Sequence, residues 1–334
     1  MHPKVVKSAI KGVLDIAHRQ TKFTNNLPGE KWFQFFLGRH PKIGLKNSEV
    51  LTKSRASVTE QNIRDWFTDF KAYIAAEGAS EILLGPSRIY NLEETGVQLC
   101  PKNGKLLGLK SEKNMYCISP GQDKQNITVL CCYGADCTGI APMIVYPYSR
   151  FPPKDIAASV SDEFVIGHSP SGWMTMDLCY KYIVNGFHKE LVDQGIQFPV
   201  LLLFDGHSSH MSLALHDFCV KKKIILYCLY PNTTHIMQPC DVGIFRPLKK
   251  CWKEQVSLHA QSSNKPISKV NFDPIFKLAY EKSCDPKVIK KAFECCGLFP
   301  CNPDIIDYSK CMSNRHKIIR DKINSEKTQE IVDQ

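Results

Sequence analysis

The hydrophobic run Val200–Phe204 predicts the most deeply buried strand of the chain. Asp205 ends this run, and Gly206 then breaks the pattern. A short apolar run closed by turn residues is typical of a strand covered on both faces of a sheet. Because α/β sheets gather their ligand chemistry at the carboxyl ends of such strands, Asp205 is a candidate site residue. The structural alternative is that Asp205 only caps the following helix.

The rest of the central pattern alternates between strand-like and helix-like segments. Further strands are predicted at 87–92, 127–133, 141–146 and 224–229. Helices are predicted at 174–194, 212–222 and 242–258. This order predicts an α/β fold, in which a mixed sheet carries helices on its faces.

The first 80 residues show helical periodicity instead. The predicted helices cover 5–19, 31–39 and 58–76, and a basic loop at 42–57 joins the last two. We expect the aromatic residues at helical spacing to form a core: Trp32, Phe35, Trp66 and Phe70. Small basic helical modules often bind DNA through a helix-turn-helix, and an ordinary helical subdomain is the alternative.

These changes divide the chain into four predicted segments. A helical module covers 1–80, and the α/β domain covers 86–260. A C-terminal helical extension covers 261–305, and a polar tail covers 306–334. The composition of the tail fits a helix or an extended segment equally well.

Composition is that of a folded, basic protein, with 43% hydrophobic residues and a net charge of +10. No apolar run approaches the ~20 residues that span a bilayer, so we expect no membrane partner. Residues 1–85 carry 13 Lys and Arg against 8 Asp and Glu, and residues 242–334 carry 17 against 11. Basic ends are suited to holding phosphate backbone around a central site. The 15 cysteines form no C-x-x-C pair, which favours buried, reduced thiols over a zinc site.

Three carboxylates occupy comparable places in the predicted sheet. Glu93 is expected to end the first strand, Asp205 ends a later one, and Asp241 begins the helix after the last strand. Three acids at one sheet edge would repel one another strongly unless divalent cations neutralised them. Two Mg²⁺ or Mn²⁺ ions, about 4 Å apart, would suit phosphoryl transfer. The sequence contains no Gly-rich phosphate loop, so it does not support nucleotide hydrolysis of that type.

Three segments resemble, in order, the catalytic blocks of the pogo/Tigger/jerky-type DDE transposases. They are 88–96 (RIYNLEETG), 200–210 (VLLLFDGHSSH) and 237–249 (MQPCDVGIFRPLK). The segment 169–174 resembles the block before the central helix of that family. Segments near both ends are also similar: 29–41 with 55–56 to the second half of a centromere protein B-type DNA-binding domain, and 290–300 to the family's C-terminal segment.

The resemblance implies a ribonuclease H-like fold, a nuclear location, and cutting and joining of double-stranded DNA by a homodimer with two Mg²⁺ or Mn²⁺ ions. It assigns catalytic and metal-binding roles to Glu93, Asp205 and Asp241. Glu93 departs from the family pattern, which has Asp at this position. The extra methylene displaces the carboxylate by more than ~1 Å, and misplacement on that scale can cost about 10²-fold in rate.

Basic and polar residues around these blocks complete the predicted site. The predicted DNA contacts are Lys31, Arg39, Lys46, Lys53, Arg55, Lys249 and Lys250, and a solvated helix face is the alternative for the last two. The predicted supporting residues are Glu94, His207, His210 and Gln238. The two histidines have a structural alternative, which is to shape the turn by hydrogen bonding.

A second departure concerns the start of the chain. The family usually carries another helix-turn-helix before the part seen here, so we expect an incomplete DNA-binding region. Together with Glu93, this favours an alternative function: a catalytically inactive, host-retained DNA-binding or chromatin protein on the same scaffold. The intact Asp205 and Asp241 favour the endonuclease.

Overall fold

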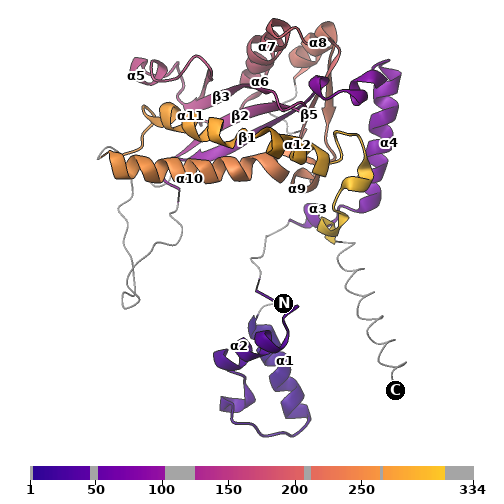
Figure 1. Ribbon diagram of the computed structural model, residues 1–334, viewed down its shortest axis with the longest axis vertical. Helices are drawn as coiled ribbons and strands as arrows, with labels where there is room; N and C mark the ends of the chain where they lie inside the picture. Colours follow the sequence, from indigo (N-terminus) through magenta and orange to yellow (C-terminus); the bar gives the residue numbers. More distant parts are fainter. Residues whose placement is uncertain (1–2, 46–51, 102–124, 207–211, 264–265, 313–334) are drawn as a thin grey trace. The chain divides into compact units, whose positions relative to one another are not determined.

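The computed structural model describes residues 3–45, 52–101, 125–206, 212–263 and 266–312 (Figure 1). The chain forms two compact units, Met1–Leu51 and Thr52–Gln334. Within the described ranges, no helix combines the length and the apolar character that crossing a bilayer requires.

The first unit contains two helices, α1 (Pro3–Ile16) and α2 (Glu30–Arg39), and the short turn η1 (Thr24–Asn26). Lys7 buries its stem over the ring of Phe33 and forms an ion pair with Glu30. Phe35 is 68% exposed, so the expectation that it joins a core is wrong. It lies on the solvent face of α2, because the helix turns Phe33 inward instead.

The second unit is built on one six-stranded sheet with the order β4-β3-β2-β1-β5-β6. The antiparallel pairs are β1–β2 and β2–β3, and the parallel pairs are β3–β4, β1–β5 and β5–β6. The strands are β1 (Ile89–Gln98), β2 (Asn126–Gly134), β3 (Gly139–Pro147), β4 (Val165–Ser169), β5 (Val200–Phe204) and β6 (Ile224–Cys228). All five residues of β5 are buried, which confirms the prediction for Val200–Phe204.

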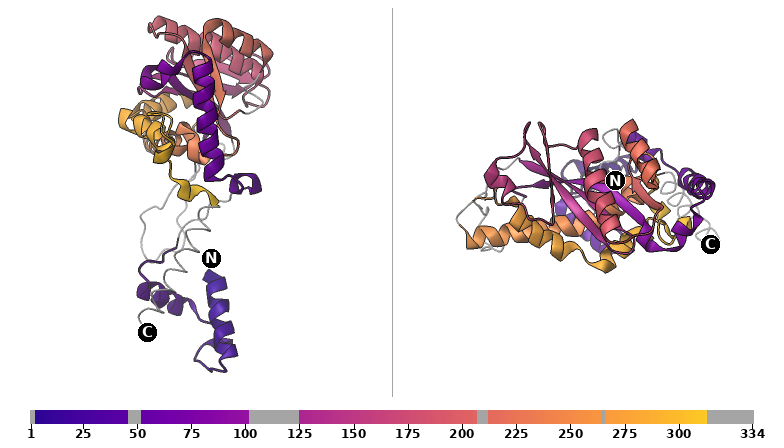
Figure 2. Two further views of the ribbon diagram at one scale, coloured as in Figure 1. Left: turned by 90° about the vertical axis from the view of Figure 1, so that its right-hand side faces the viewer. Right: turned by 90° about the horizontal axis from the view of Figure 1, so that it is seen from above.

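Helices cover both faces of this sheet (Figure 2). One layer contains α6 (Met176–Tyr182), the π-helical turn η4 (Ile183–Phe187), α7 (His188–Asp193) and α8 (Leu213–Lys222). The other contains α9 (Thr234–Met237), the π-helical turn η6 (Cys240–Ile244), α10 (Phe245–Ser262), α11 (Phe272–Ser283) and α12 (Pro286–Cys295). Short segments complete the unit: η2 (Ser80–Leu84), η3 (Pro86–Arg88), α5 (Lys154–Ala157), η7 (Pro303–Ile305) and η8 (Tyr308–Lys310). The predicted α/β fold with a mixed, helix-flanked sheet is confirmed.

The interval 1–80, which the sequence assigns to one helical module, is shared between the two units. α3 (Lys53–Ala56) and α4 (Glu60–Ala76) belong to the second unit. The indole Nε1 of Trp66 donates to the carbonyl oxygen of Cys228 at 3.0 Å, and its ring packs edge-on against Tyr227. α4 therefore packs on the edge strand β6. The predicted loop at 42–57 also contains α3, one turn capped by the hydroxyl of Thr52.

Two strands differ from the predictions. β4 was not predicted, because only five residues separate a polar loop from a Gly/Pro/Ser-rich segment. β1 was expected to end at Glu93, but it continues to Gln98. The extension arises because β2 pairs with β1 along its whole length, from Tyr90↔Gly134 to Gln98↔Asn126. Glu93 is therefore a mid-strand residue.

Candidate active site

Glu93 lies on β1, and Asp205 directly follows the end of β5, the parallel neighbour of β1. Asn91 of β1 pairs with Leu203 of β5, and each acid follows two residues later. Side chains alternate between the faces of a strand, so both acids share the face of Leu203. Leu203 packs into the core formed with α10, α11 and α12. This face also carries η6, and with it Asp241.

Asp241 is the second residue of the π-helical turn η6. Such turns occur frequently at functional sites, because they change the direction of one side chain within a helix. Gly243 in the same turn packs tightly on α12, since a Cβ at Gly243 would lie 2.6 Å from the Cβ of Ala292. The absence of a side chain at position 243 lets η6 approach α12 and fixes the place of Asp241.

Two fully buried amides connect the elements that carry the acids. The Nδ2 of Asn91 donates to the carbonyl of Leu203 at 3.0 Å and to the Oε1 of Gln238 at 3.1 Å. Its Oδ1 accepts the backbone N–H of Cys240 at 3.1 Å. One side chain of β1 thus joins β5, Gln238 and η6. The sequence reasoning missed Asn91, whose signal is a polar residue inside an apolar strand.

The carboxylate of Glu93 is held by two donors. The side-chain amide of Gln238 donates to Oε2, and the backbone N–H of Glu94 donates to Oε1 at 2.9 Å. In the part of the chain that the structure describes, no three His, Cys, Asp or Glu side chains stand close enough to share a metal ion. The expected three-acid cluster is therefore not assembled in this conformation. The longer side chain of Glu93 bonds to Gln238 and to its own strand.

Asp205 and Asp241 do influence each other. Although Asp241 is exposed at the surface, the surrounding protein partly desolvates its carboxylate and raises its pKa. Lys249 and Arg55 lower the pKa of Asp241, whereas the negative charge of Asp205 raises it. A pair of carboxylates in this state favours the uptake of positive charge.

The thiol of Cys240, which is fully buried beside Asp241 in the sequence, is not a suitable metal ligand. Burial is the main cause that raises the pKa of Cys240, and the charges of Glu93 and Asp241 add to it. The thiol therefore stays protonated near neutral pH, and a protonated thiol is a poor metal ligand. The donor set of the site consists of carboxylate oxygens, which is the chemistry that Mg²⁺ and Mn²⁺ prefer.

Two cations approach Asp241 from different elements. Lys249 lies on α10, one helical segment after η6. Arg55 lies on α3, and its Nη2 donates to the Oγ1 of Thr234 on α9 at 3.3 Å. Arg55 thus belongs to the second unit with the acids, although the sequence assigns it to the helix-turn-helix module.

The other predicted site residues are dispersed. Glu94 lies on the opposite sheet face, where its charge contributes to raising the pKa of Cys179. Lys250 lies 3.9 Å from Glu254, within the same helix. Lys31 and Arg39 belong to α2 of the first unit, and Lys53 is exposed on α3. Lys46, His207 and His210 lie outside the described residues.

Sequence comparison identifies the family. Residues 124–294, half of the chain, match the profile of the DDE superfamily endonuclease. The chain belongs to this family. The matched region contains Asp205, Asp241 and Lys249, whereas Glu93 lies before it. This supports the resemblance to pogo/Tigger-type DDE transposases.

One curated relative of this DDE-family chain is much longer than the chain itself. A protein of Cochliobolus lunatus named MFS-type transporter clz9 is 27% identical over 253 residues, which are 73% of this chain. Those residues are 26% of that protein, so the chain spans about a quarter of this curated relative.

Solved structures of Mos1 transposase share the fold. Its paired-end complex with the left transposon end has a TM-score of 0.55 at 12% identity, covering 92% of this chain and 78% of that one. The Mos1 paired-end complex with Mn has a TM-score of 0.52 at 12% identity, covering 92% and 78%. The sheet of this DDE-family chain is thus ribonuclease H-like, as the resemblance implies.

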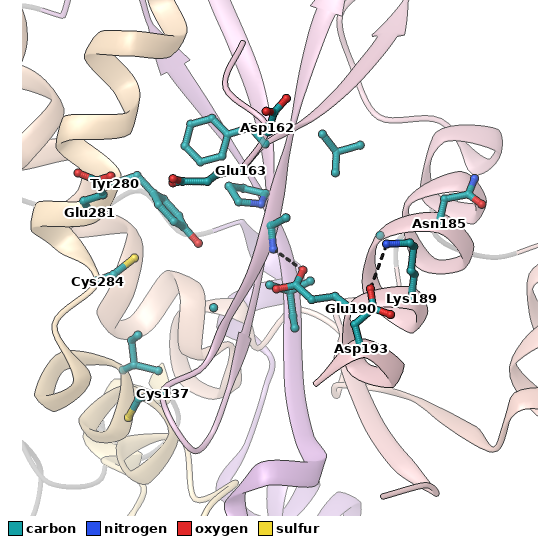
Figure 3. A pocket seen from close by; sticks show the side chains of 18 residues that line it. Cys137, Asp162, Glu163, Asn185, Lys189, Glu190, Asp193, Tyr280, Glu281 and Cys284 are labelled. Atoms are coloured by element: carbon teal, nitrogen blue, oxygen red, sulfur yellow. Dashed lines mark hydrogen bonds and ion pairs between the residues drawn. The ribbon is translucent and has the colours of Figure 1, made fainter. Parts of the chain in front are cut away.

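A hollow of about 600 Å³ lies away from the acids, where β3, α7 and α11 meet (Figure 3). Its charged lining residues are Asp162, Glu163, Lys189, Glu190, Asp193 and Glu281. Lys277 pairs with Glu163 and Lys189 pairs with Asp193, but the carboxylates outnumber these lysines, and a lining of net negative charge repels a polyanion. This hollow therefore does not suit a nucleic-acid backbone.

Proposed function

We propose that this DDE-family chain is a transposon-derived endonuclease that cuts and joins double-stranded DNA with Mg²⁺ or Mn²⁺. The observation that carries the proposal is that the charges of Asp205 and Asp241, both inside the region that matches the family, act on each other. Its action as a homodimer in the nucleus, on transposon ends or genomic sites, is part of the same proposal. The Mos1 paired-end complex with a transposon end, which shares the fold, supports DNA as the partner.

The residues have separate parts in this chemistry. Asp205 and Asp241 would bind the cations, because their mutual repulsion falls when positive charge lies between them. Bound cations would supply nucleophile activation and stabilisation of the leaving oxygen. Glu93, two residues beyond the paired part of β1, would complete the site once its carboxylate leaves the amide of Gln238. Asn91 holds β1, β5 and η6 together through its hydrogen bonds to Leu203 and Cys240.

Nicking of supercoiled plasmid in Mn²⁺ tests the proposal. We expect the unaltered chain to cut, Asp205→Asn to lose at least about 10²-fold in rate, and Glu93→Asp to cut faster. Asp217→Asn, an exposed acid on α8, is the matched control and should cut like the unaltered chain. Equal rates for Asp205→Asn and Asp217→Asn would contradict the proposed site.

One observation favours the second function, a DNA-binding protein without catalysis. The carboxylate of Glu93 accepts hydrogen bonds from the Glu94 N–H and from Gln238, and it forms no three-acid cluster among the described residues. If Glu93 stays hydrogen-bonded to Gln238, its carboxylate does not bind a metal ion and takes no part in catalysis. This second function would be supported if the unaltered chain binds DNA while neither it nor Glu93→Asp nicks the plasmid.

A further inference from the structure

A groove of about 860 Å³ begins at Asp241 and follows α10. Its charged lining residues are Asp241, Arg246, Lys249, Lys250 and Lys253. A neighbouring hollow of about 300 Å³ shares Lys249 and Lys253 and reaches Gly96–Gln98 of β1. The two hollows therefore form one strip, which leads from Asp241 past the strand that carries Glu93.

The cations of this strip differ in their partners. Lys250 lies 3.9 Å from Glu254. Arg246, Lys249 and Lys253 are exposed and have no acidic side chain within 4 Å among the described residues. An unpaired cation loses no ion pair when a phosphate approaches. These three are therefore the groups of the strip that are ready to bind an anion.

The spacing of these cations fits a polynucleotide strand. Positions 246, 249 and 253 fall on one side of a helix, and seven residues of helix rise about 10 Å. One DNA strand carries a phosphate roughly every 3.4 Å along the duplex axis, so about three phosphates fall within that length. Three unpaired cations thus face a comparable number of phosphate charges.

Arg55 adds a positive charge near Asp241 from a second element, α3. Its guanidinium is bonded to Thr234 on α9 at 3.3 Å, in the chain segment that leads into η6. Both Arg55 and Lys249 lower the pKa of Asp241, so both charges lie within electrostatic reach of this acid. A guanidinium fixed by a neutral hydroxyl keeps its charge and most of its donors for a phosphate.

We infer that Arg55, Arg246, Lys249 and Lys253 bind phosphates of one DNA strand and so lead this strand across Asp241. The inference rests on the proposed function for the identity of the polyanion, and it deepens that function by giving the strand a path. It also moves Arg55 from a helix-turn-helix contact to a positioning residue of the catalytic unit. Lys250, which pairs with Glu254, contributes less.

Salt-dependent DNA binding tests this path. The full chain, Lys249→Gln/Lys253→Gln and Arg55→Gln are titrated onto fluorescent 30-base-pair DNA at several KCl concentrations, without divalent cations. We expect the double variant to bind at least about tenfold more weakly and to lower the slope of log K against log[salt] by about 2, one for each lost phosphate contact. Arg55→Gln should lower this slope by about 1.

Lys221→Gln is the matched control, because it removes an exposed lysine from α8 on the other sheet face. We expect it to keep the affinity and the slope of the unaltered chain. Circular dichroism melts establish that each variant is folded. Slopes of the double variant and Arg55→Gln that equal the slope of Lys221→Gln would overturn the inference.

The plasmid assay separates this inference from the proposed function. If the chain binds DNA through these residues but never cuts, the phosphate path stands and the endonuclease fails. If the chain cuts and the Lys249 and Lys253 substitutions change neither rate nor binding, the endonuclease stands and the path fails.

Discussion

The side-chain amide of Gln238 donates a hydrogen bond to the carboxylate of Glu93, the acid that the resemblance aligns with an Asp of the family. Gln238 precedes Asp241 by three residues, so the segment that positions Asp241 also holds Glu93. The Oε1 of Gln238 accepts from Asn91, which orients the amide so that its NH₂ faces Glu93. An aspartate at position 93 would be too short to make the same contact. The hydrogen bond to Gln238 therefore depends on having Glu rather than Asp at position 93.

The buried network around Asn91 is expected to dominate the stability of this region. Asn91→Leu leaves Cys240 N–H and Gln238 Oε1 without a partner, at a cost of about 3 kcal/mol in the free energy of unfolding. Urea denaturation measures this loss. Asn185→Leu, at an exposed position, should change the value by less than about 0.5 kcal/mol. Similar losses for both variants would show that the network is not needed.

The contact between η6 and α12 predicts a second-site rescue. Gly243→Ala should lower the free energy of unfolding by about 2 kcal/mol, because its Cβ would collide with Ala292. Ala292→Gly removes the closest contact and leaves one of 3.2 Å to the backbone Cα, so the double variant should be more stable than Gly243→Ala alone, even though glycine in a helix costs about 1 kcal/mol. Gly96→Ala is the control for added volume, since a Cβ there meets open space. Strictly additive losses in the double variant would refute the steric explanation.

Asp273 predicts a pH dependence of stability. Burial raises the pKa of Asp273 to about 6, partly opposed by the Ser161 N–H and by Lys277. The folded state therefore holds its proton more tightly than the unfolded state, and stability falls as pH rises from about 4 to about 6. The shift corresponds to about 3 kcal/mol, lost fully above pH 6. Asp273→Asn keeps an acceptor for Ser161 but does not titrate.

Urea denaturation at pH 4 and pH 7 checks this prediction. The free energy of unfolding of Asp273→Asn, relative to the unaltered chain, should rise by up to about 3 kcal/mol between the two pH values. Asp162→Asn serves as the control, because this acid lies at the surface of the same region. A difference that stays constant with pH would show that Asp273 does not titrate in this range.

Trp66 predicts that α4 unfolds with the α/β unit. Trp66→Ala removes a nearly buried indole and its hydrogen bond to the carbonyl of Cys228. It should lower the free energy of unfolding of the second unit by about 3–5 kcal/mol, and so lower the temperature of the main thermal transition. Phe35→Ala in the first unit, at a side chain that is 68% exposed, should leave this transition unchanged. Differential scanning calorimetry compares the two. An unchanged transition in Trp66→Ala would place α4 outside the cooperative unit.

The sequence predicts the local elements well where the pattern is periodic or strongly apolar. Val200–Phe204 is a buried strand as expected, and the helix predicted at 58–76 is α4 (Glu60–Ala76). The length of β1 could not be predicted from its own residues, because it depends on pairing with β2. β4 is too short to give a pattern of its own.

The candidate site is predictable in part for a similar reason. Asp205 stands out because an apolar strand ends at it, and Asp241 because it follows a polar loop. The hydrogen bonds from Gln238 and Glu94 to Glu93 depend on side-chain conformation, which no spacing rule contains. Arg55 was given a DNA contact in the wrong structural context, since only tertiary packing brings α3 to α9.

The central claim is that Asp205 and Asp241 together hold a divalent cation, and Mn²⁺ binding followed by electron paramagnetic resonance tests it most directly. We predict that Asp205→Asn and Asp241→Asn each weaken binding by at least about tenfold, and that affinity increases as the pH rises through the raised pKa of Asp241. The exposed-acid variant Asp217→Asn should bind like the unaltered chain. If all three variants bind Mn²⁺ as the unaltered chain does, the carboxylate pair is not a metal site and the account is contradicted.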